Sequence, residues 1–405
     1  MTTLTSDDHV VVVGAGLAGW RLCEALRHEG YDGAITLIGA EADPPYDRPP
    51  LSKQVLAGKW SPDQTTLATP ERLAAAAATT HFGVAATGLD VEGAAVTLAD
   101  GRVVAGTRVV VATGARARVL PFRAADRTRT LRSRADAVAL IGAVEHLAPG
   151  TPVVVVGGGF VGAEVATSLK ARGLAPLVLE AAARPLVTVL GEEVSHWLAG
   201  LAASAGVELR NHQQVRDVVE DGDALRVDLA GGAVAAPVVV VAVGAAPNVD
   251  WLVESGIALD GGVVVDENFR AAPRVAAIGD VARFDWLNVA GTEAIRLEHW
   301  QNANDHARVL ARAWVSGASP AGLTVPYFWS DQYGAKIQLL GHPHVTDDVT
   351  EISREPGRFT ALYSRHDLVT GVVTLSQPRV LMLSRVLLEE PTTLTRALDE
   401  APWRA

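Results

Sequence analysis

Residues 10–19 read VVVVGAGLAG, and residues 153–162 read VVVVGGGFVG. In each copy, four consecutive valines suit a strand that is buried on both faces, and a GxGxxG turn follows the strand. A helical pattern then leads to a glycine stop, with apolar residues recurring on one face: Leu22, Cys23 and Leu26 before Gly30, and Val161, Val165 and Leu169 before Gly173. A second strand comes next, AITLIG in the first copy and APLVLE in the second. The chain therefore contains the same strand–helix–strand opening twice.

The glycines of each turn indicate a binding site for a pyrophosphate. They permit a tight turn and let the phosphates approach the backbone at a helix N-terminus, where free N–H groups and the helix dipole favour negative charge. A single GxGxxG also serves packing alone, but two copies in the same context make packing alone a poor explanation. We predict two dinucleotide sites, one at Gly14, Ala15, Gly16 and Gly19 and the other at Gly157, Gly159 and Gly162.

An acidic residue about 20 positions after the last glycine accepts the ribose hydroxyls of a bound dinucleotide. Glu180 ends the second strand of the second copy, and its carboxylate would repel a 2′-phosphate. This favours NAD(H) over NADP(H), although Arg184 lies close enough in sequence to leave the alternative open. In the first copy Glu41 is the better candidate, with Asp43 as a solvated alternative.

Composition describes a soluble globular protein of 405 residues, 49% of them apolar, with a net charge of −11. The acidic balance argues against nucleic acid and anionic membranes as partners. We expect no membrane segment, because no apolar run reaches the ~18 residues that a membrane helix needs. The start, MTTLTSDDH, has acid where a signal peptide has base, which predicts a cytoplasmic location.

Cys23 is the only cysteine, which rules out an intramolecular disulfide, a cysteine-ligated iron–sulfur cluster and a CxxC redox pair. Its place on the core face of a predicted helix favours a structural role. We expect no metal site, because the isolated histidines His28, His212 and His342 offer no ligand spacing.

The remaining sequence suggests three domains in an α/β chain. The stretch GRVVAGTRVVVATGA resembles a strand pair, and VAAIGDVARF runs a buried strand into a turn. From about Gly322 the pattern changes to alternating strands and a final helix, RVLMLSRVLLEE. We predict two Rossmann-like dinucleotide-binding domains and a C-terminal α+β domain: a discontinuous first domain at 1–118 and 247–321, a second at 119–246, and a third at 322–405.

Two nucleotide sites in one chain suggest a bound flavin and a diffusible nicotinamide that exchange a hydride. The first GxGxxG, ATGA at 112–115, the second GxGxxG followed by Glu164, and AIGD at 277–280 occur in order. Together they resemble the two-dinucleotide flavoprotein reductases of the glutathione-reductase-like fold. That resemblance implies FAD in the first domain and NAD(P)H in the second.

The branch of that family follows from the stretch 43–53, DPPYDRPPLSK. Disulfide reductases place redox cysteines after the second strand, whereas this chain has a stiff proline loop there. Three segments resemble those of the FAD-dependent NADH:ferredoxin reductases of the putidaredoxin reductase type, which serve Rieske-type dioxygenases and haem-thiolate monooxygenases. They are this proline loop, RLEHWQNA at 296–303 and PYFWSDQYG at 326–334. The resemblance implies FAD and NADH as cofactors and a 2Fe–2S ferredoxin as partner. Two alternatives stay open: a reductase of a small acceptor such as a quinone or an ascorbate-like radical, and a non-enzymatic flavoprotein.

The same resemblance assigns roles to individual residues. Lys53 would reach the flavin near its hydride-accepting nitrogen, unless it is a surface lysine. Glu164 would lie beside the nicotinamide, orient its carboxamide and pair with Lys53, although the helix dipole alone also suits a carboxylate there. Asp280 after Gly279 would accept a ribityl hydroxyl of FAD, unless it is a plain turn aspartate.

Further FAD contacts rest on motif alignment. Thr113 and Gly114 belong to ATGA, Arg132 would meet the pyrophosphate, and Ala86 and Trp300 would approach FAD through their backbones. Arg48 lies in the proline loop, where it is either part of the site or solvated. Trp329 is either core packing or faces the ferredoxin near the flavin edge. Ferredoxins are usually acidic, so docking needs a local basic patch, to which Arg296 or Arg308 are candidates.

Overall fold

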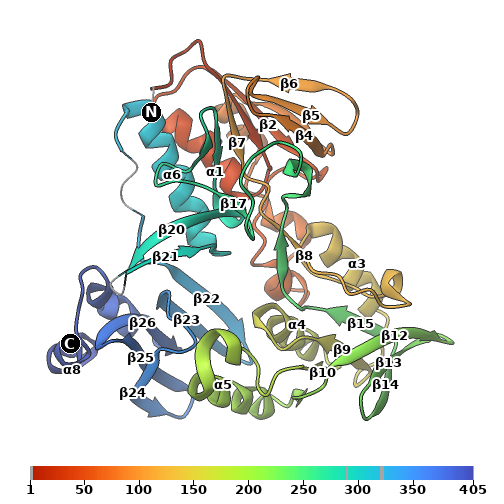
Figure 1. The fold of residues 1–405 in the computed structure, drawn as a ribbon. Helices are drawn as coiled ribbons and strands as arrows, with labels where there is room; N and C mark the ends of the chain where they lie inside the picture. Colours follow the sequence, from red (N-terminus) through yellow and green to blue (C-terminus); the bar gives the residue numbers. More distant parts are fainter. Residues whose placement is uncertain (1–2, 289–290, 320–322, 405) are drawn as a thin grey trace. The chain divides into compact units, whose positions relative to one another are not determined.

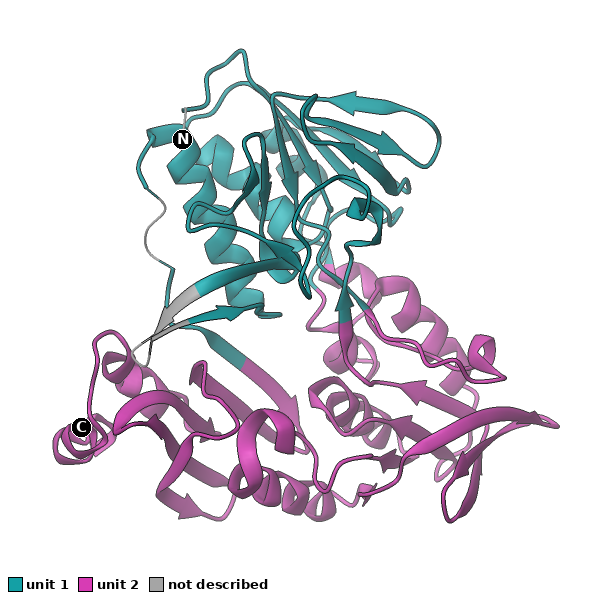
Figure 2. Ribbon diagram, viewed as in Figure 1, with its two compact units in different colours: residues 1–47, 66–116, 246–328 teal, residues 48–65, 117–245, 329–405 magenta. Residues whose placement is uncertain are grey.

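The computed structural model describes residues 3–288, 291–319 and 323–404 (Figure 1). The chain groups into two compact units, which we call unit 1 and unit 2 (Figure 2). Unit 1 contains residues 1–47, 66–116 and 246–328, and unit 2 contains residues 48–65, 117–245 and 329–405. The three domains with the boundaries given above stay a prediction.

A six-stranded sheet forms the centre of unit 1. Its order is β18-β19-β7-β1-β2-β3, and every pair is parallel except β18 with β19. The strands are β1 (His9–Val13), β2 (Ala34–Gly39), β3 (Thr79–Phe82), β7 (Arg108–Val111), β18 (Arg270–Ala272) and β19 (Val275–Ala277). Because β2 and β7 flank β1 on opposite sides, the strand order reverses at β1. Ligands of doubly wound sheets bind beside the carboxyl ends of the strands at such a point.

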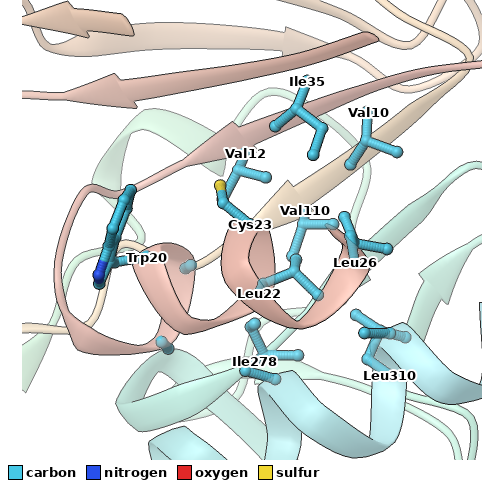
Figure 3. Close-up of a cluster of buried hydrophobic side chains, with 14 of the residues drawn as sticks. Val10, Val12, Trp20, Leu22, Cys23, Leu26, Ile35, Val110, Ile278 and Leu310 are labelled. Carbon is cyan, nitrogen blue, oxygen red and sulfur yellow. The ribbon is translucent and has the colours of Figure 1, made fainter. Parts of the chain in front are cut away.

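Both faces of this sheet are buried, as the valine runs predict. On one face Val10, Val12 and Val110 pack with helices α1 (Leu17–His28) and α6 (Trp300–Ser316), and Figure 3 shows this core. On the other face Val11, Val109 and their neighbours pack with the small antiparallel sheet of β4 (Ala86–Asp90), β5 (Ala95–Leu98) and β6 (Val103–Ala105). The predicted strand pair in GRVVAGTRVVVATGA is therefore two strands, β6 and β7, of different sheets.

Shorter elements complete unit 1. The 3-10 turn η5 (Gly279–Val281) follows β19, and β17 (Val263–Val264), β20 (Ala282–Asn288) and β21 (Gly291–Ile295) form a three-stranded sheet. The others are α2 (Pro70–Ala76) and the 3-10 turn η4 (Asp250–Leu252). The chain crosses between the units within β8 (Ala115–Ala117) and β16 (Ala245–Pro247).

Unit 2 repeats the strand–helix–strand opening on a parallel sheet of its own. The order is β11-β10-β9-β15, with β9 (Pro152–Val156), β10 (Ala175–Leu179), β11 (Glu208–Arg210) and β15 (Val238–Val241). Helix α4 (Phe160–Ala171) follows β9, and the antiparallel strands β12 (Val215–Asp221), β13 (Ala224–Leu229) and β14 (Gly232–Ala236) pack on the sheet. One expectation was wrong: Val161 is 43% exposed, because the buried stripe of α4 begins at Gly162.

Unit 2 also contains an antiparallel sheet of order β22-β23-β26-β25-β24. Its strands are β22 (Tyr327–Gln332), which begins in unit 1, β23 (Ala335–Gly341), β24 (Asp348–Glu355), β25 (Arg358–Arg365) and β26 (Leu368–Leu375). The predicted final helix is only partly right, since α7 (Pro378–Leu383) passes into the 3-10 turn η6 (Ser384–Leu388). Further helices are α3 (Arg134–Val144), α5 (Val187–Ser204) and α8 (Leu394–Glu400), with 3-10 turns η2 (Pro62–Thr65), η3 (Ala125–Arg127) and η7 (Pro402–Arg404).

The proline loop differs from the expectation at its end. We expected no helix, but Leu51–Val55 forms a π-helical turn, η1, whose backbone bonds run from Val55 N–H to Pro50 C=O and from Leu56 N–H to Leu51 C=O. A proline can precede a helix because the first N–H groups lack partners anyway. Among the described residues, no helix combines the length and the apolar character that a membrane crossing needs.

Candidate functional site

The first glycine turn lies between β1 and α1 in unit 1. Gly14 has φ +117°, and a Cβ there would lie 2.1 Å from the Ala112 carbonyl oxygen. A Cβ on Gly19 would lie 2.0 Å from the Gly14 carbonyl oxygen. At Gly16, which caps the helix, no described atom lies within 4 Å of an added Cβ. Packing therefore requires the outer two glycines, and open space in front of the helix N-terminus fits a pyrophosphate.

Thr113 and Gly114 follow β7, beside this turn. The Thr113 hydroxyl donates to the Asn248 carbonyl (2.8 Å), and the Asn248 side-chain amide donates to the Thr113 carbonyl (2.9 Å). Gly114 has φ +64° and accepts from the Asn248 N–H (3.0 Å). The ATGA turn is thus tied to the segment that re-enters unit 1, and its first residues, Ala112 and Thr113, lie against Gly14.

Gly279 and Asp280 form a third turn at the end of β19. Gly279 has φ +72°, and its N–H donates to Nδ1 of His306 on α6 (3.2 Å). His306 is fully buried between the rings of Phe269 and Phe284, and burial lowers its pKa to about 3. The neutral imidazole can therefore act as the acceptor that holds this turn.

Glu41, Trp300 and Ala86, which we predict as FAD contacts, also lie in unit 1. The Tyr46 hydroxyl donates to Glu41 Oε2 at 2.5 Å, which sets the direction of that carboxylate. The Trp300 indole donates to Asp47 Oδ1 at 2.8 Å, and Trp300 is the first residue of α6. Ala86 begins β4 and pairs with Leu98.

The second glycine turn, in unit 2, has the same construction. Gly157 has φ +103°, and a Cβ there would lie 2.4 Å from the Ala242 carbonyl oxygen. A Cβ on Gly162 would lie 2.0 Å from the Gly157 carbonyl oxygen, whereas at Gly159 no described atom lies within 4 Å. The residues of this turn therefore fit a second dinucleotide for the same reason.

A cleft of about 420 Å³ opens beside this turn, and Gly157, Gly159, Glu180 and Arg184 line it. Glu180 Oε2 accepts the Gly158 N–H (2.7 Å), and Oε1 accepts the Ala182 N–H (2.8 Å). The carboxylate is thus fixed at the cleft by the backbone. Arg184, which left the NADP(H) alternative open, forms an ion pair with Glu192.

A buried cluster in unit 2 joins Lys53 and Glu164. Lys53 on η1 lies with Nζ 2.8 Å from Glu164 Oε2, and their side chains are 13% and 7% exposed. The Ser52 hydroxyl donates to the same Oε2 at 2.6 Å, and the Ser330 hydroxyl donates to Oε1 at 2.6 Å. Ser168, one turn along α4 from Glu164, donates to the Ser52 carbonyl at 2.6 Å.

The other predicted residues of unit 2 are Arg48, Arg132 and Trp329. The Arg48 guanidinium donates to the Arg132 carbonyl (2.7 Å), and the Arg132 N–H donates to Asp136 at the start of α3 (2.8 Å). Trp329 on β22 is half-buried, which leaves both of its expected roles open.

Five residues of these sites escaped the sequence reasoning: Ser52, Ser330, Tyr46, Asp47 and His306. Ser52, Tyr46 and Asp47 lie inside the proline loop, so the loop was the signal, although the chemistry drew attention to its lysine and arginine. Ser330 follows Trp329, and His306 lies on a predicted helix where nothing marks it as an acceptor. Tyr46 contacts the nearby Glu41, whereas the roles of the other four depend on contacts with distant parts of the chain.

Comparison with known proteins agrees with this geometry. Residues 8–307 match the family model of the pyridine nucleotide-disulphide oxidoreductases, and residues 327–402 match one described as reductase C-terminal. The chain is 34% identical to rhodocoxin reductase of Rhodococcus erythropolis, covering 96% of this chain and 92% of that protein. It is 32% identical to putidaredoxin reductase of Pseudomonas putida, covering 93% and 90%.

Solved structures give the same result. The crystal structure of the covalent putidaredoxin reductase–putidaredoxin complex matches with a TM-score of 0.92 at 31% identity, covering 99% of this chain and 98% of that chain. The predicted fold class, with two dinucleotide-binding sheets and a C-terminal α+β part, is confirmed. Since the first family model spans most of the chain, this protein belongs to the pyridine nucleotide-disulphide oxidoreductase family, and within it resembles the putidaredoxin and rhodocoxin reductases.

Proposed function

We infer that this protein is an FAD-dependent NADH:ferredoxin reductase, which passes single electrons to a 2Fe–2S ferredoxin that feeds a monooxygenase or a ring-hydroxylating dioxygenase. The observation that carries this inference is the pair of glycine turns, each at the carboxyl end of a parallel strand in its own sheet. Relatives of similar length are named as reductases of this kind. FAD, when bound, accepts the hydride of NADH and releases the two electrons one at a time.

The first glycine turn supports FAD binding in unit 1. Gly14, Ala15, Gly16 and Gly19 would cradle the pyrophosphate, and Glu41, held by Tyr46, would accept the ribose hydroxyls. The remaining contacts that we propose are Ala86, Thr113, Gly114, Gly279, Asp280 and Trp300 in unit 1, and Arg48, Lys53 and Arg132 in unit 2.

The second turn supports NADH binding. Gly157, Gly159 and Gly162 would receive its pyrophosphate, and Glu180 would accept the adenosine ribose hydroxyls from the wall of the cleft. The ion pair of Arg184 with Glu192 is consistent with NADH, because a guanidinium that reads a 2′-phosphate would need to give up that carboxylate.

Lys53 and Glu164 are the groups that we assign to alignment of the hydride step. Glu164 would orient the carboxamide of the nicotinamide, and the Lys53 ammonium would stabilise negative charge on the reduced flavin. The hydrogen bonds from Ser52 and Ser330 keep the carboxylate in one place, which alignment requires.

The acceptor follows from the relatives and from the thiol content. Disulfide reductases need a cysteine pair, whereas Cys23 is alone and buried in the core of α1. A small-molecule acceptor is not favoured, since the relatives reported above are named as reductases of rhodocoxin and putidaredoxin, and one solved structure is a complex with putidaredoxin. Docking of the ferredoxin near Trp329 is part of the proposal.

The test is anaerobic stopped-flow mixing of the FAD-loaded protein with NADH and then with a 2Fe–2S ferredoxin. We expect bleaching of the flavin, followed by its reoxidation as two ferredoxins are reduced for each NADH consumed. Bleaching without transfer to several different ferredoxins, together with rapid turnover of a quinone, would replace this acceptor with a small molecule. Absence of bleaching would reject the enzyme assignment itself.

A cytoplasmic location also belongs to this proposal. Fractionation of cells that express the untagged protein tests it, and recovery in a secreted fraction would contradict it.

A further inference from the structure

We propose that Ser330, on the first strand of the C-terminal sheet, is a positioning residue for hydride transfer. It acts through Glu164: its hydroxyl fixes the plane of that carboxylate so that one acceptor direction remains for the carboxamide of the nicotinamide. The inference rests on the proposed placement of Glu164 beside the nicotinamide, and it adds a role for a part of the chain outside both glycine turns.

The hydrogen bond from Ser330 has a defined direction. Its Oγ lies 2.6 Å from Glu164 Oε1, and the Gln332 side-chain amide donates to the same Oγ from 3.2 Å. A serine hydroxyl has one hydrogen and two lone pairs. Since Gln332 is the donor in its hydrogen bond with Ser330, the hydroxyl hydrogen of Ser330 remains available to bond Glu164. The exposed fractions of Ser330, Gln332 and Glu164 are 0%, 2% and 5%, so water does not compete at this place.

The other carboxylate oxygen is already saturated. Glu164 Oε2 accepts from the Ser52 hydroxyl at 2.6 Å and from Lys53 Nζ at 2.8 Å. A carboxylate oxygen accepts about two hydrogen bonds. Within the part of the chain that the structure describes, Glu164 Oε1 accepts a hydrogen bond from Ser330 alone. One further acceptor position therefore remains on Oε1. An amide N–H₂ such as the carboxamide of nicotinamide suits that position.

Without Ser330 the carboxylate plane would lose its anchor. The terminal torsion of a glutamate has a broad, soft profile, so hydrogen bonds rather than rotamer preference fix it. Ser52 and Lys53 both bind Oε2, and a carboxylate held at one oxygen can pivot about it. The remaining acceptor on Oε1 would then turn away from a fixed direction, and the nicotinamide ring would lose alignment while the adenosine end of the dinucleotide kept its contacts.

The experiment compares Ser330→Ala with the matched control Ser384→Ala. Ser384, the first residue of η6, is also fully buried, and its hydroxyl donates to the Val380 carbonyl at 2.9 Å. Calorimetry on the oxidised, FAD-loaded protein gives the affinity for NAD⁺ and for ADP-ribose, which lacks the nicotinamide. Stopped-flow mixing with NADH gives the limiting rate of flavin reduction.

We expect Ser330→Ala to weaken NAD⁺ binding and to slow the limiting rate, each about tenfold, the effect of removing one hydrogen bond to a charged group. ADP-ribose binding stays within twofold of the wild type, Ser384→Ala changes none of the three values, and Ser330→Thr restores most of the rate. In a Glu164→Gln background the further effect of Ser330→Ala disappears, because both changes act on the same group.

Two results would overturn the inference: equal loss of NAD⁺ and ADP-ribose affinity, which indicates a general structural role, or a rate and affinity within twofold of the wild type. If Ser330→Ala does not fold, Ser330→Cys keeps the shape and weakens the donor, and the same criteria apply. Failure of the proposed function itself is distinguishable, because it shows in the wild type, as absence of flavin bleaching by NADH.

Discussion

Glu164 is a carboxylate almost completely enclosed by protein, and three donors from two separate segments contact it: Ser52 and Lys53 on η1, and Ser330 on β22. Enclosing an ion is costly unless it is paired and hydrogen-bonded, and removing one partner of such a pair leaves the other uncompensated. The four side chains therefore depend on one another energetically. A substitution at any of its members changes both the stability of unit 2 and the alignment that we assign to Glu164.

Substituting Lys53 by methionine tests the buried cluster around Glu164. We expect the limiting rate of flavin reduction to fall at least about tenfold and the flavin potential to become more negative, because a cation near the reduced flavin is lost. We also expect the free energy of unfolding to decrease by roughly 3 kcal/mol, since a buried carboxylate loses its partner. Stopped-flow kinetics, potentiometry and urea unfolding measure these three changes.

Lys59→Met is the control for that substitution, because Lys59 is an exposed lysine a few residues further along the chain. It should leave rate, potential and stability as they are. If Lys53→Met left the potential and the rate unchanged as well, Lys53 would have only a structural role in its ion pair with Glu164.

Glu180, which lines the cleft beside the second glycine turn, is the residue that we propose to select NADH over NADPH. Its carboxylate, held by the N–H groups of Gly158 and Ala182, would repel a 2′-phosphate. We expect Glu180→Ala to reduce the ratio of kcat/KM for NADH over NADPH at least about tenfold, which corresponds to about 1.4 kcal/mol. Glu208→Ala, an exposed site on β11, should not change the ratio. A wild-type enzyme that uses both cofactors equally well would contradict the role of Glu180.

At the scale of elements, helix α4 connects three parts of unit 2 through one polar face. Glu164, Thr167 and Ser168 lie one turn apart on it. Glu164 accepts hydrogen bonds from Ser52 on η1 and Ser330 on β22. Thr167 accepts the Tyr333 N–H at 2.8 Å, and the Ser168 hydroxyl donates to the Ser52 carbonyl. Since a π-helical turn such as η1 spaces its backbone bonds differently from an α-helix, a side-chain donor for one of its carbonyls helps to keep it in place.

Helix α6 has a corresponding role in unit 1 through His306. This histidine accepts the Gly279 N–H and is enclosed by Phe269 and Phe284. Burial lowers the pKa of His306 from an ordinary 6.5 to about 3. As pH falls below about 6.5, the unfolded chain binds a proton here that the folded chain does not, so stability is lost progressively down to about pH 3.

We therefore expect the free energy of unfolding to decrease by about 2 kcal/mol from this group between pH 7 and pH 5. In His306→Gln that part of the pH dependence disappears, even though the variant is less stable at pH 7. Urea midpoints at the two pH values give the difference, and His146→Gln, whose side chain is 84% exposed, serves as control. An identical pH dependence in the wild type and His306→Gln would show that His306 does not stay neutral in the folded protein.

At the scale of the whole molecule, each unit has one glycine turn, a parallel sheet of its own and a core of its own. Besides the two predicted dinucleotide sites, the chain has a single thiol, that of Cys23, that could carry electrons. Burial raises the pKa of the Cys23 thiol to about 12, and α1 encloses it against the sheet (Figure 3). A thiolate nucleophile is therefore not accessible in the folded protein.

Cys23→Ala tests the absence of a thiol relay. We expect the rate of ferredoxin reduction to stay within twofold of the wild type, while the free energy of unfolding decreases by about 1 kcal/mol because the core loses a small buried group. A variant with normal flavin reduction but no transfer to ferredoxin would mean that the thiol does take part.

Local patterns in the sequence determined the larger part of this fold. The valine runs alternate between two buried faces, and the glycines at Gly14 and Gly157 occur where positive φ and close backbone approach exclude a side chain. Such features depend on residues that are neighbours in the chain, so they can be predicted from the sequence. For the same reason the errors concern elements whose limits depend on packing, namely the exposed Val161, the shortened α7 and the π-helical turn at Leu51–Val55.

Only the tertiary structure decided which side chains surround the predicted ones. Ser330 contacts Glu164 from 166 positions away in the chain, and His306 contacts Gly279 from 27 positions away. No periodicity or spacing encodes such a pair, because a serine or a histidine has many possible partners and the fold selects one by distance. The sequence by itself determined that two dinucleotide sites exist and that a thiol relay does not. The folded chain decided how Glu164 and Lys53 are held, since that depends on donors which meet only after the strands and helices have packed.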